Sequence, residues 1–376
     1  CSIIKIIGNF LYEITKKERE HFMKKLKLFR KIKSILSILL ISLLIIPLCS
    51  GIGIHAKEKN TESNEYKIYP IPHSVVYDNE QFVMSDRVHV VFEEGIDKAT
   101  QNFLEEVITD YGKTVVHSEE IVNGETTILL GIKGSNGKAD SYINKNTTIK
   151  TSDLFNRTDS YILSAKENII SIVGKDTDST FFGIATLQMM LTSYEDPALR
   201  SVQIEDFSDI QYRGFIEGFY GGWDYKSRES LMRFARDVKM NHYIYASKTD
   251  PYHTSKWGEL YPQSEIDQIQ KLVKVGEETK CYYTWSVHIS GFFTNLDTSN
   301  ETAYNERYQK LLAKFRQLYD AGVRKFDILN DDFGQGTHED VVNLLNKLTK
   351  EFIIPNNCKP ITYCMQGYNK AWSKRG

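Results

Sequence analysis

The chain has 376 residues, of which 41% are hydrophobic and 12% aromatic, so it is long enough for two globular units with packed cores. Its 47 basic and 49 acidic side chains nearly cancel, and no segment combines a basic stripe with interleaved aromatic residues. The composition therefore argues against a nucleic-acid-binding protein.

The amino-terminal region is typical of an exported protein. From Met23, a cluster of basic residues precedes a largely apolar run at 35–48, which is shorter than the roughly 20 residues of a membrane-spanning helix. We therefore predict a signal peptide at 23–56, a secreted mature protein and no membrane span after cleavage. Residues 1–22 are interpreted as an upstream extension translated in error. A lipoprotein anchor on Cys49 is the alternative, but a large apolar residue stands where such processing requires a small one.

A polar segment at 57–65 predicts a flexible linker before the first folded unit. The next segment, 66–207, mixes short apolar runs of β type with two stretches of helical periodicity. Strands are predicted at 88–92, 126–132, 161–165 and 169–173, and helices at 98–111 and 179–193. The last two strands are close enough for a hairpin. Together these elements predict a small α+β domain.

From residue 211 the pattern changes to short apolar strands that alternate with long amphipathic helices. Strands are predicted at 213–219, 242–246, 282–287, 325–330 and 360–364, and helices at 227–238, 265–278, 301–319 and 338–352. The alternation predicts the α/β class and a (β/α)8 TIM-type barrel, of which 211–376 holds about five βα units, because a full barrel needs roughly 250 residues. We interpret the chain as truncated at its carboxyl end. An open doubly wound sheet is the structural alternative, since it needs no closing strands.

Cysteine and histidine are sparse beyond the signal peptide. Cys281, Cys358 and Cys364 are an odd, scattered set, which is not the pattern of a disulfide framework. His253 and His338 are isolated in the sequence and lack zinc-type spacing. We predict no metal and no cofactor.

In a βα barrel the reactive groups lie at the carboxyl ends of the strands, where the loops converge. The first predicted barrel strand ends in a glycine-rich and aromatic segment around Gly218, and the second ends in a polar segment around Lys248. The fourth ends in Asp331 and Asp332, adjacent carboxylates that repel one another unless one is protonated or hydrogen-bonded. These acids could instead cap the following helix, or share a divalent cation with Asp327.

The positions of the two acids limit the kind of glycosidase that they could serve. A retaining enzyme with a protein nucleophile needs carboxyl groups about 5–5.5 Å apart on opposite sides of the bond, and an inverting enzyme needs about 6.5–9.5 Å. Neighbours on one strand, such as Asp331 and Asp332, suit instead a mechanism in which the substrate's acetamido oxygen is the nucleophile. One aspartate would steer the acetamido group while the other protonates the leaving oxygen.

Four segments of the barrel region stand out in combination. They are Arg213-Gly214 through Gly221, Tyr243-Ile244-Tyr245-Ala246 leading to Lys248, Asp250-Pro251-Tyr252-His253, and Asp331-Asp332. Together they resemble glycoside hydrolase family 84, the β-N-acetylglucosaminidases that include bacterial enzymes called hyaluronidases and the O-GlcNAcases. The resemblance covers essentially all of 211–376. The preceding segment, with Tyr69-Pro70-Ile71-Pro72 near its start, similarly resembles the small amino-terminal domain of such hexosaminidases.

The resemblance implies a retaining, substrate-assisted exo-β-N-acetylglucosaminidase that removes terminal N-acetylglucosamine from glycoproteins or glycosaminoglycans through an oxazoline intermediate. It implies that Asp331 polarises the acetamido N–H and that Asp332 is the general acid and then the base. Gly218, through its carbonyl oxygen, and Lys248 would hold sugar hydroxyls, and Tyr368 would touch the acetamido oxygen. The expected partners are glycans or glycoproteins that contain N-acetylglucosamine.

Two other functions stay open. The family's remaining sugar-binding residues lie on strands later than those of 211–376, so a non-catalytic glycan-binding protein or an inactive fragment is the main alternative. A metal-binding adhesion module that uses Asp327, Asp331 and Asp332 is the other.

Overall fold

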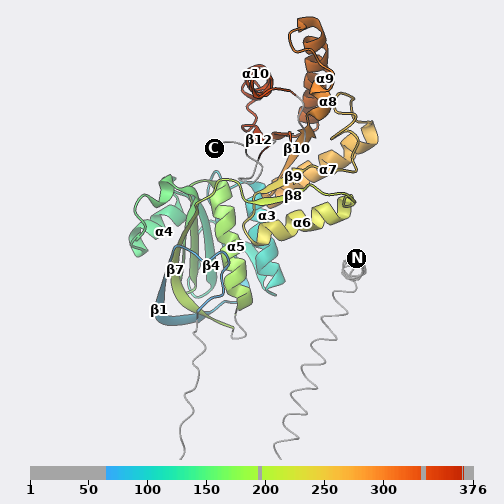
Figure 1. The fold of residues 1–376 in the computed structure, drawn as a ribbon. Coiled ribbons are helices and arrows are strands. Elements are labelled where there is room, and N and C mark those ends of the chain that lie inside the picture. The colour runs from blue at the N-terminus through green and yellow to red at the C-terminus, as the bar shows by residue number, and fades with distance from the viewer. Residues whose placement is uncertain (1–64, 194–196, 332–335, 366, 368–376) are drawn as a thin grey trace, which may run out of the picture. The chain divides into compact units, whose positions relative to one another are not determined.

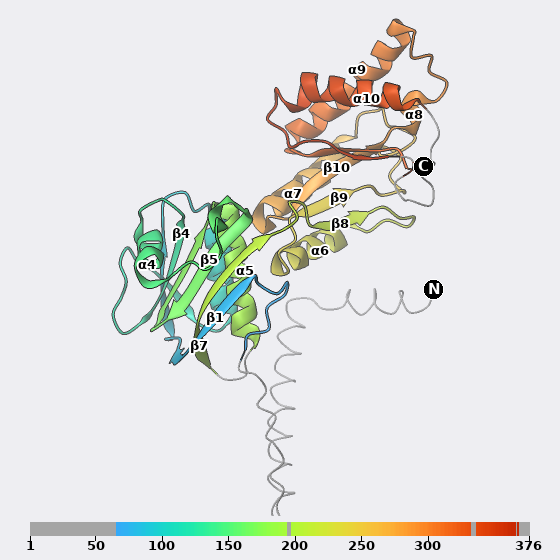
Figure 2. The ribbon, with the colours of Figure 1, turned by 60° about the vertical axis from the view of Figure 1, so that its left-hand side comes forward.

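The structure of the protein is a computed structural model, in which residues 63–376 form one compact unit with two separate sheets (Figures 1 and 2). The described residues are 65–193, 197–331, 336–365 and 367. The predicted extension, the signal peptide and nearly all of the predicted linker lie outside them. Every helix in the described part of the chain is too short or too polar to cross a membrane.

The first sheet belongs to an amino-terminal unit, residues 65–208, and has seven strands in the order β1-β7-β5-β6-β4-β2-β3. The strands are β1 (Ser74–Val83), β2 (Arg87–Phe92), β3 (Thr114–His117), β4 (Thr126–Ile132), β5 (Thr158–Lys166), β6 (Ile169–Gly174) and β7 (Ala198–Ser208). Neighbours from β3 to β6 pair in parallel, whereas β5, β7 and β1 continue the sheet with antiparallel pairings. This mixed sheet confirms the predicted α+β character.

Helices cover both faces of the first sheet. α3 (Lys98–Asp110) and α5 (Thr177–Ser193) share a hydrophobic core with one face, and α4 (Lys138–Asn146) with the short 3-10 helix η1 (Leu154–Asn156) packs on the other. Because side chains alternate along a strand, Ile128 and Leu130 of β4 join the first core while Leu129 joins the second.

The predicted hairpin is confirmed, but other elements of this unit were not predicted. β5 and β6 pair antiparallel around Glu167 and Asn168, whose φ angles of 51° and 67° suit a tight two-residue turn. The sequence patterns missed β1, β3, β7 and α4. β1 is an edge strand with mostly exposed side chains, and α4 is a nine-residue, largely polar helix, so neither carries a strong apolar pattern.

The second sheet forms a half-barrel, residues 213–365, and all of its neighbouring strands are parallel. The strands, in order along the sheet, are β8 (Gly214–Glu217), β9 (His242–Tyr245), β10 (Tyr282–His288), β11 (Phe326–Leu329) and β12 (Thr362–Cys364). The helices are α6 (Tyr225–Asp237), α7 (Gln263–Thr279), α8 (Ser290–Phe293), α9 (Glu301–Asp320), α10 (His338–Leu348) and the π-helical turn η2 (Thr349–Ile353).

This half-barrel confirms the prediction of about five βα units of a TIM-type barrel. The strand order follows the chain without the reversal of a doubly wound sheet, and α6, α7, α9 and α10 share a single core with one face of the sheet. The doubly wound alternative is therefore wrong.

Polar contacts join the half-barrel to the amino-terminal unit. Lys239 donates to the Tyr161 hydroxyl at 2.9 Å and to Asp206 Oδ2 at 3.0 Å, and all three side chains are buried. Arg236 makes a bidentate pair with Glu106 at 2.8 and 2.9 Å. Burial lowers the pKa of Lys239, and the nearby Asp206 carboxylate opposes that shift.

Gly214 at the start of β8 provides a test of strand packing. A Cβ atom there would lie 1.6 Å from the backbone oxygen of His242 on β9, whereas a Cβ at Gly218 would have no neighbour closer than 3.7 Å. We expect Gly214→Ala to lower the free energy of unfolding by about 2–3 kcal/mol, because two paired strands must separate. Gly218→Ala, the matched control, should stay within about 0.5 kcal/mol of the parent in urea unfolding. Equal stability of the two variants would contradict the close approach of β8 and β9.

Candidate functional site

The carboxyl ends of the half-barrel strands bring together several predicted site residues. Parallel strands all end at the same edge of a sheet, so Gly218 after β8, Lys248 after β9, His288 at the end of β10 and Asp331 after β11 share that edge. On β10, Val287 belongs to the core beneath the helices, so the alternation of side chains places His288 on the opposite, inner face.

At this edge Asp331 lies between Lys248 and His288. Its Oδ2 lies 3.7 Å from Lys248 Nζ, and its Oδ1 lies 3.7 Å from His288 Nε2. The side chain is 24% exposed, yet Oδ1 itself is buried and has no hydrogen-bond donor in reach among the described residues. A buried acceptor without a donor is uncommon in folded proteins and requires an explanation, of which a ligand that supplies an N–H or O–H group is one.

His288 forms a hydrogen bond with the backbone of Asp331. His288 Nδ1 faces the Ser290 hydroxyl at 3.0 Å, and Nε2 faces the Asp331 backbone oxygen, which can only accept, so Nε2 carries a proton. Nε2 in turn donates to the backbone oxygen of Asp331 at 3.0 Å. The histidine therefore fixes the turn after β11, and its ring borders the buried carboxylate oxygen.

Glu217 supports the glycine-rich loop that contains Gly218. The Glu217 carboxylate is fully buried and accepts from Arg228 Nε at 2.8 Å, from the Tyr243 hydroxyl at 2.5 Å and from the Trp223 backbone N–H at 3.0 Å. Burial would raise the pKa of Glu217, but the hydrogen bonds from Arg228, Tyr243 and Trp223 outweigh it and hold the pKa below its ordinary value. The charged Glu217 carboxylate, whose two oxygens both accept hydrogen bonds, therefore holds the glycine-rich loop in place.

His253 lies under the segment that carries Lys248. Its Nδ1 donates to the Ser286 backbone oxygen at 2.8 Å, and its own backbone oxygen accepts from the His288 N–H at 2.9 Å. Burial lowers the pKa of His253 to about 4, so the ring is neutral near neutral pH. His253, which has no neighbouring ligand-type residue in the sequence, ties the Lys248 segment to β10 in the fold.

The structure also bears on the two alternative roles of Asp331 and Asp332, as a helix cap and as part of a cation site. α10 is capped by Thr337 in a capping box with Asp340, so the pair does not supply its N-cap. Asp327 lies inside the sheet, where Lys325 Nζ at 2.9 Å and the Thr362 N–H at 3.0 Å both donate to it. Asp327 and Asp331 therefore contact different residues, and the described residues do not bring them together as ligands of one cation. Asp332 and Tyr368 lie outside the described residues.

Comparisons with known proteins give the family. Residues 213–375 match the family model for β-N-acetylglucosaminidase, and residues 65–207 match that for glycosyl hydrolase family 20, domain 2. The solved structure of CpGH84D superimposes with a TM-score of 0.73 and 40% identity over 80% of this chain and 50% of that one. The chain belongs to glycoside hydrolase family 84.

Two further sets of relatives agree with the assignment to family 84. CpGH84B aligns with a TM-score of 0.68 and 28% identity, again over 80% of this chain and 50% of its own. The rat and mouse proteins named Protein O-GlcNAcase are 29% identical over 120 residues, which is 32% of this chain and 12% of each relative. The family 84 chain thus spans about half the length of the solved structures that it matches.

Sequence reasoning missed two residues of this family 84 site. His288 ends the third barrel strand, and the rule that reactive groups follow strand ends would have found it had that strand been searched. Glu217 was seen only as the start of a glycine-rich segment. Its signal was a charged residue at the end of an otherwise apolar strand, which predicts a buried partner such as Arg228.

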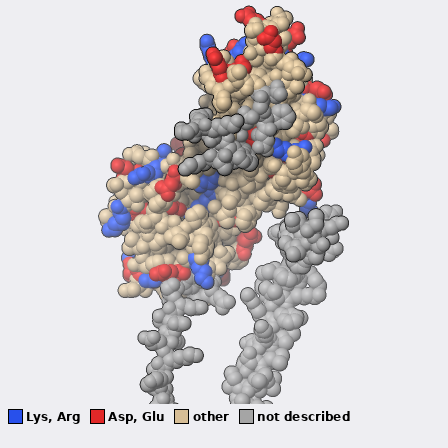
Figure 3. Space-filling model, viewed as in Figure 1, with Lys and Arg blue, Asp and Glu red and all other residues tan. Residues whose placement is uncertain are grey.

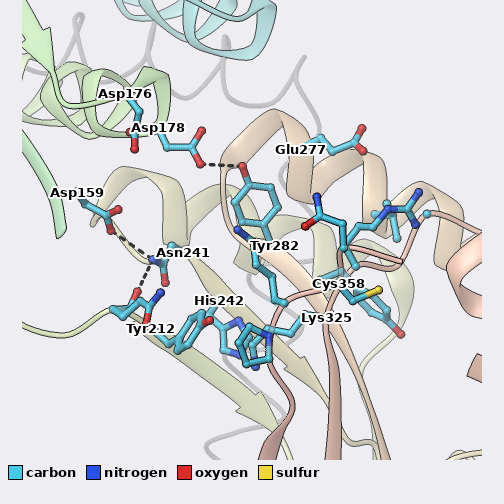
Figure 4. A pocket seen from close by; sticks show the side chains of 18 of the residues that line it. Asp159, Asp176, Asp178, Tyr212, Asn241, His242, Glu277, Tyr282, Lys325 and Cys358 are labelled. Carbon is cyan, nitrogen blue, oxygen red and sulfur yellow. Dashed lines mark hydrogen bonds between the residues drawn. The ribbon is translucent and has the colours of Figure 1, made fainter. Parts of the chain in front are cut away.

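A cavity of the described residues lies at the other end of the sheet. It measures about 810 Å3 and its lining includes His242 and Tyr282, the first residues of β9 and β10, and Asp159 and Asp178 of the amino-terminal unit. Figure 4 shows Asp178 accepting from the Tyr282 hydroxyl, which joins the two units across it. The amino ends of barrel strands carry stability rather than chemistry, so this cavity is not the candidate site.

Acidic and basic side chains are both scattered over the face of the molecule drawn in Figure 3, with broad uncharged areas between them. The presence of both signs agrees with the near-neutral composition.

Proposed function

We propose that the site at the carboxyl ends of β8 to β11 hydrolyses terminal β-linked N-acetylglucosamine with retention of configuration, using the substrate's acetamido oxygen as the nucleophile. The observation that carries this proposal is the state of Asp331. Its buried Oδ1 lacks a donor, while Lys248 balances its charge from 3.7 Å on the other oxygen. An acetamido N–H is a donor of the right kind for that oxygen.

Each predicted site residue then has a role in the reaction. Asp331 accepts the acetamido N–H, which directs the acetamido oxygen to attack the anomeric carbon and form an oxazoline. Asp332 gives its proton to the leaving oxygen as the C–O bond breaks, and then takes a proton from the water that opens the oxazoline. Lys248 and the carbonyl oxygen of Gly218 hold sugar hydroxyls, and Tyr368 contacts the acetamido oxygen. The carbonyl and ammonium groups fix the sugar before the chemistry begins.

The substrate and the location of the enzyme are part of the same proposal. The relatives named Protein O-GlcNAcase act, by that name, on protein-linked N-acetylglucosamine, which supports a glycoprotein substrate here. Glycosaminoglycan fragments that end in the same sugar present the same acetamido group. The basic and apolar segment that follows Met23 supports export, so the substrate would be met outside the cell.

The proposal is tested by turnover and binding measured side by side. Residues 57–376, and a hybrid in which 57–365 are continued by the second half of the CpGH84D barrel, are assayed with 4-methylumbelliferyl β-N-acetylglucosaminide. Release of the β-anomer, followed by proton NMR, supports the retaining mechanism. Binding of N-acetylglucosamine without turnover in either form would favour the non-catalytic glycan-binding alternative, and the absence of both would overturn the assignment of the site.

The role of Asp332 predicts an effect that depends on the leaving group. Asp332→Asn cannot protonate the departing oxygen, so kcat should fall by roughly 10²–10⁴ for a poorly activated aryl glycoside. For a strongly activated dinitrophenyl glycoside, whose leaving group needs no proton, kcat/KM should stay close to the parent value, whereas kcat should fall because Asp332 also activates the water that opens the oxazoline. Asp320→Asn at the exposed end of α9 is the control. An equal loss on both substrates would remove Asp332 from the role of general acid.

A further inference from the structure

We propose that Lys314 and Gln317 of α9 form a clasp that positions Lys248 for sugar binding. The clasp acts on the β9–α7 loop, residues 246–262, which leaves the sheet at the site and returns on the helical side. The inference rests on the proposed function, because it assigns to Lys248 the contact with the substrate. Lys314 and Gln317 are positioning residues and do not themselves reach the site.

Lys314 is a fully buried lysine whose donors go to the loop. Its Nζ donates to the backbone oxygens of Tyr252 and Lys256, both at 2.8 Å. The ammonium group also lies over the rings of Tyr252, Tyr261 and Trp285, at 5.2, 5.1 and 5.7 Å from their centroids. Lys314 therefore contacts two positions of the loop backbone and three aromatic rings.

Gln317 holds the far end of the same loop. Its Oε1 accepts from the backbone N–H of Tyr261 at 2.9 Å, and its Nε2 donates to the backbone oxygen of Tyr261 at 2.8 Å. The Tyr261 hydroxyl then donates to Asp250 at 2.6 Å, and the Tyr245 hydroxyl on β9 donates to the same carboxylate at 2.9 Å. Both ends of the loop are thereby tied to α9 and to the strand from which Lys248 emerges.

A continuous set of contacts runs from the clasp to the catalytic edge. Lys314 holds the backbone of Tyr252, and the next residue, His253, accepts from the backbone N–H of His288 at 2.9 Å. His288 Nε2 in turn donates to the backbone oxygen of Asp331 at 3.0 Å. Movement of the loop would therefore change the position of Lys248 relative to Asp331, which stand 3.7 Å apart.

The charge of Lys314 distinguishes the clasp from ordinary packing. Burial lowers the pKa of Lys314 to about 7, although Asp250 and Glu259 attract the ammonium group. A lysine at such a position is costly unless its donors are used, and a leucine or methionine would fill the space at a smaller desolvation cost. A lysine can donate hydrogen bonds to the two backbone oxygens of the loop, whereas an apolar residue cannot.

The clasp is tested by Lys314→Met and Gln317→Leu in the full chain and in the hybrid that carries the second barrel half. Hydrogen exchange followed by mass spectrometry should show faster exchange in 249–261 in both variants and unchanged exchange in the amino-terminal unit. On 4-methylumbelliferyl β-N-acetylglucosaminide, KM should rise about tenfold with kcat changed less than about threefold, because misplacement of a binding group acts first on substrate affinity. Lys310→Met, an exposed lysine one turn earlier on α9, is the matched control.

Each outcome separates the clasp from the function on which it rests. Unchanged exchange of the loop in both variants overturns the clasp, whatever the kinetics. Faster exchange with a lower kcat and an unchanged KM overturns the positioning of Lys248, because that pattern reflects only a smaller fraction of folded enzyme. If neither parent form turns over substrate, the proposed function fails, and the same comparison is then made on the dissociation constant for N-acetylglucosamine, which must rise in both variants.

Discussion

Asp331→Asn should lower kcat/KM for 4-methylumbelliferyl β-N-acetylglucosaminide by roughly 10²–10³ in an active form of the protein, because a single preorganised polar contact at a reacting group has this effect. In the proposed reaction the carboxylate accepts the acetamido N–H, and Lys248 Nζ lies 3.7 Å from its other oxygen. The amide has no charge and a weaker acceptor, so the acetamido oxygen loses both its orientation and part of its nucleophilicity. Steady-state kinetics of the variant measure the effect.

The loss in Asp331→Asn should not depend on the leaving group, which separates Asp331 from Asp332. A dinitrophenyl and a poorly activated aryl glycoside should slow by the same factor, because the attack of the acetamido oxygen is impaired in both. Asp320→Asn again reports any effect of removing a carboxylate elsewhere. A variant that kept the parent kcat/KM would show that the acetamido group is steered by another residue.

Arg228→Met should destabilise the half-barrel by about 3–5 kcal/mol, the usual consequence of leaving a buried charge without its partner. Glu217 is fully buried and takes two of its hydrogen bonds from Arg228, at 2.8 and 2.9 Å. The free energy of unfolding from urea titration at pH 7, followed by tryptophan fluorescence, measures the loss. The double variant Glu217→Gln, Arg228→Met should recover part of it, because the amide needs no counter-charge.

The same pair predicts a pH dependence. The pKa of Glu217 in the folded parent lies below its ordinary value, so its contribution to stability is present above that value and is lost as pH falls through the folded pKa. In Arg228→Met, burial is no longer opposed by the guanidinium and the pKa rises, so the variant gains stability as pH falls and Glu217 takes up a proton. The difference between parent and variant should therefore shrink between pH 7 and about pH 4.

A second arginine of the same helix supplies the control. Arg233 pairs with Glu229 at 2.9 Å and with Glu278 at 3.0 Å, but its side chain is 41% exposed. Exposed pairs contribute little, so Arg233→Met should cost less than about 1 kcal/mol and show no such pH dependence. Equal losses in Arg228→Met and Arg233→Met would mean that burial of Glu217 does not determine the cost.

The barrel half was predictable because its strands and helices alternate with clear apolar periods. The rule of strand ends then placed Gly218, Lys248 and Asp331 on one edge, as the structure shows, while Asp332 and Tyr368 fall outside the described residues. Edge strand β1 escaped prediction because an edge can be polar on both faces. The roles of Lys314 and Gln317 could not be predicted either, because their contacts with the β9–α7 loop form only when α9 packs over β10.

The buried contact between Lys239, Tyr161 and Asp206 has a consequence for how this protein can be divided. A border near residue 210 separates two family patterns, and it invites the preparation of the barrel half alone. A barrel half released there would present to water an ammonium group and a surface that in the whole protein are covered by a tyrosine and a carboxylate. We therefore expect the amino-terminal unit and the half-barrel to unfold together, since evolutionary modules and cooperative folding units need not coincide.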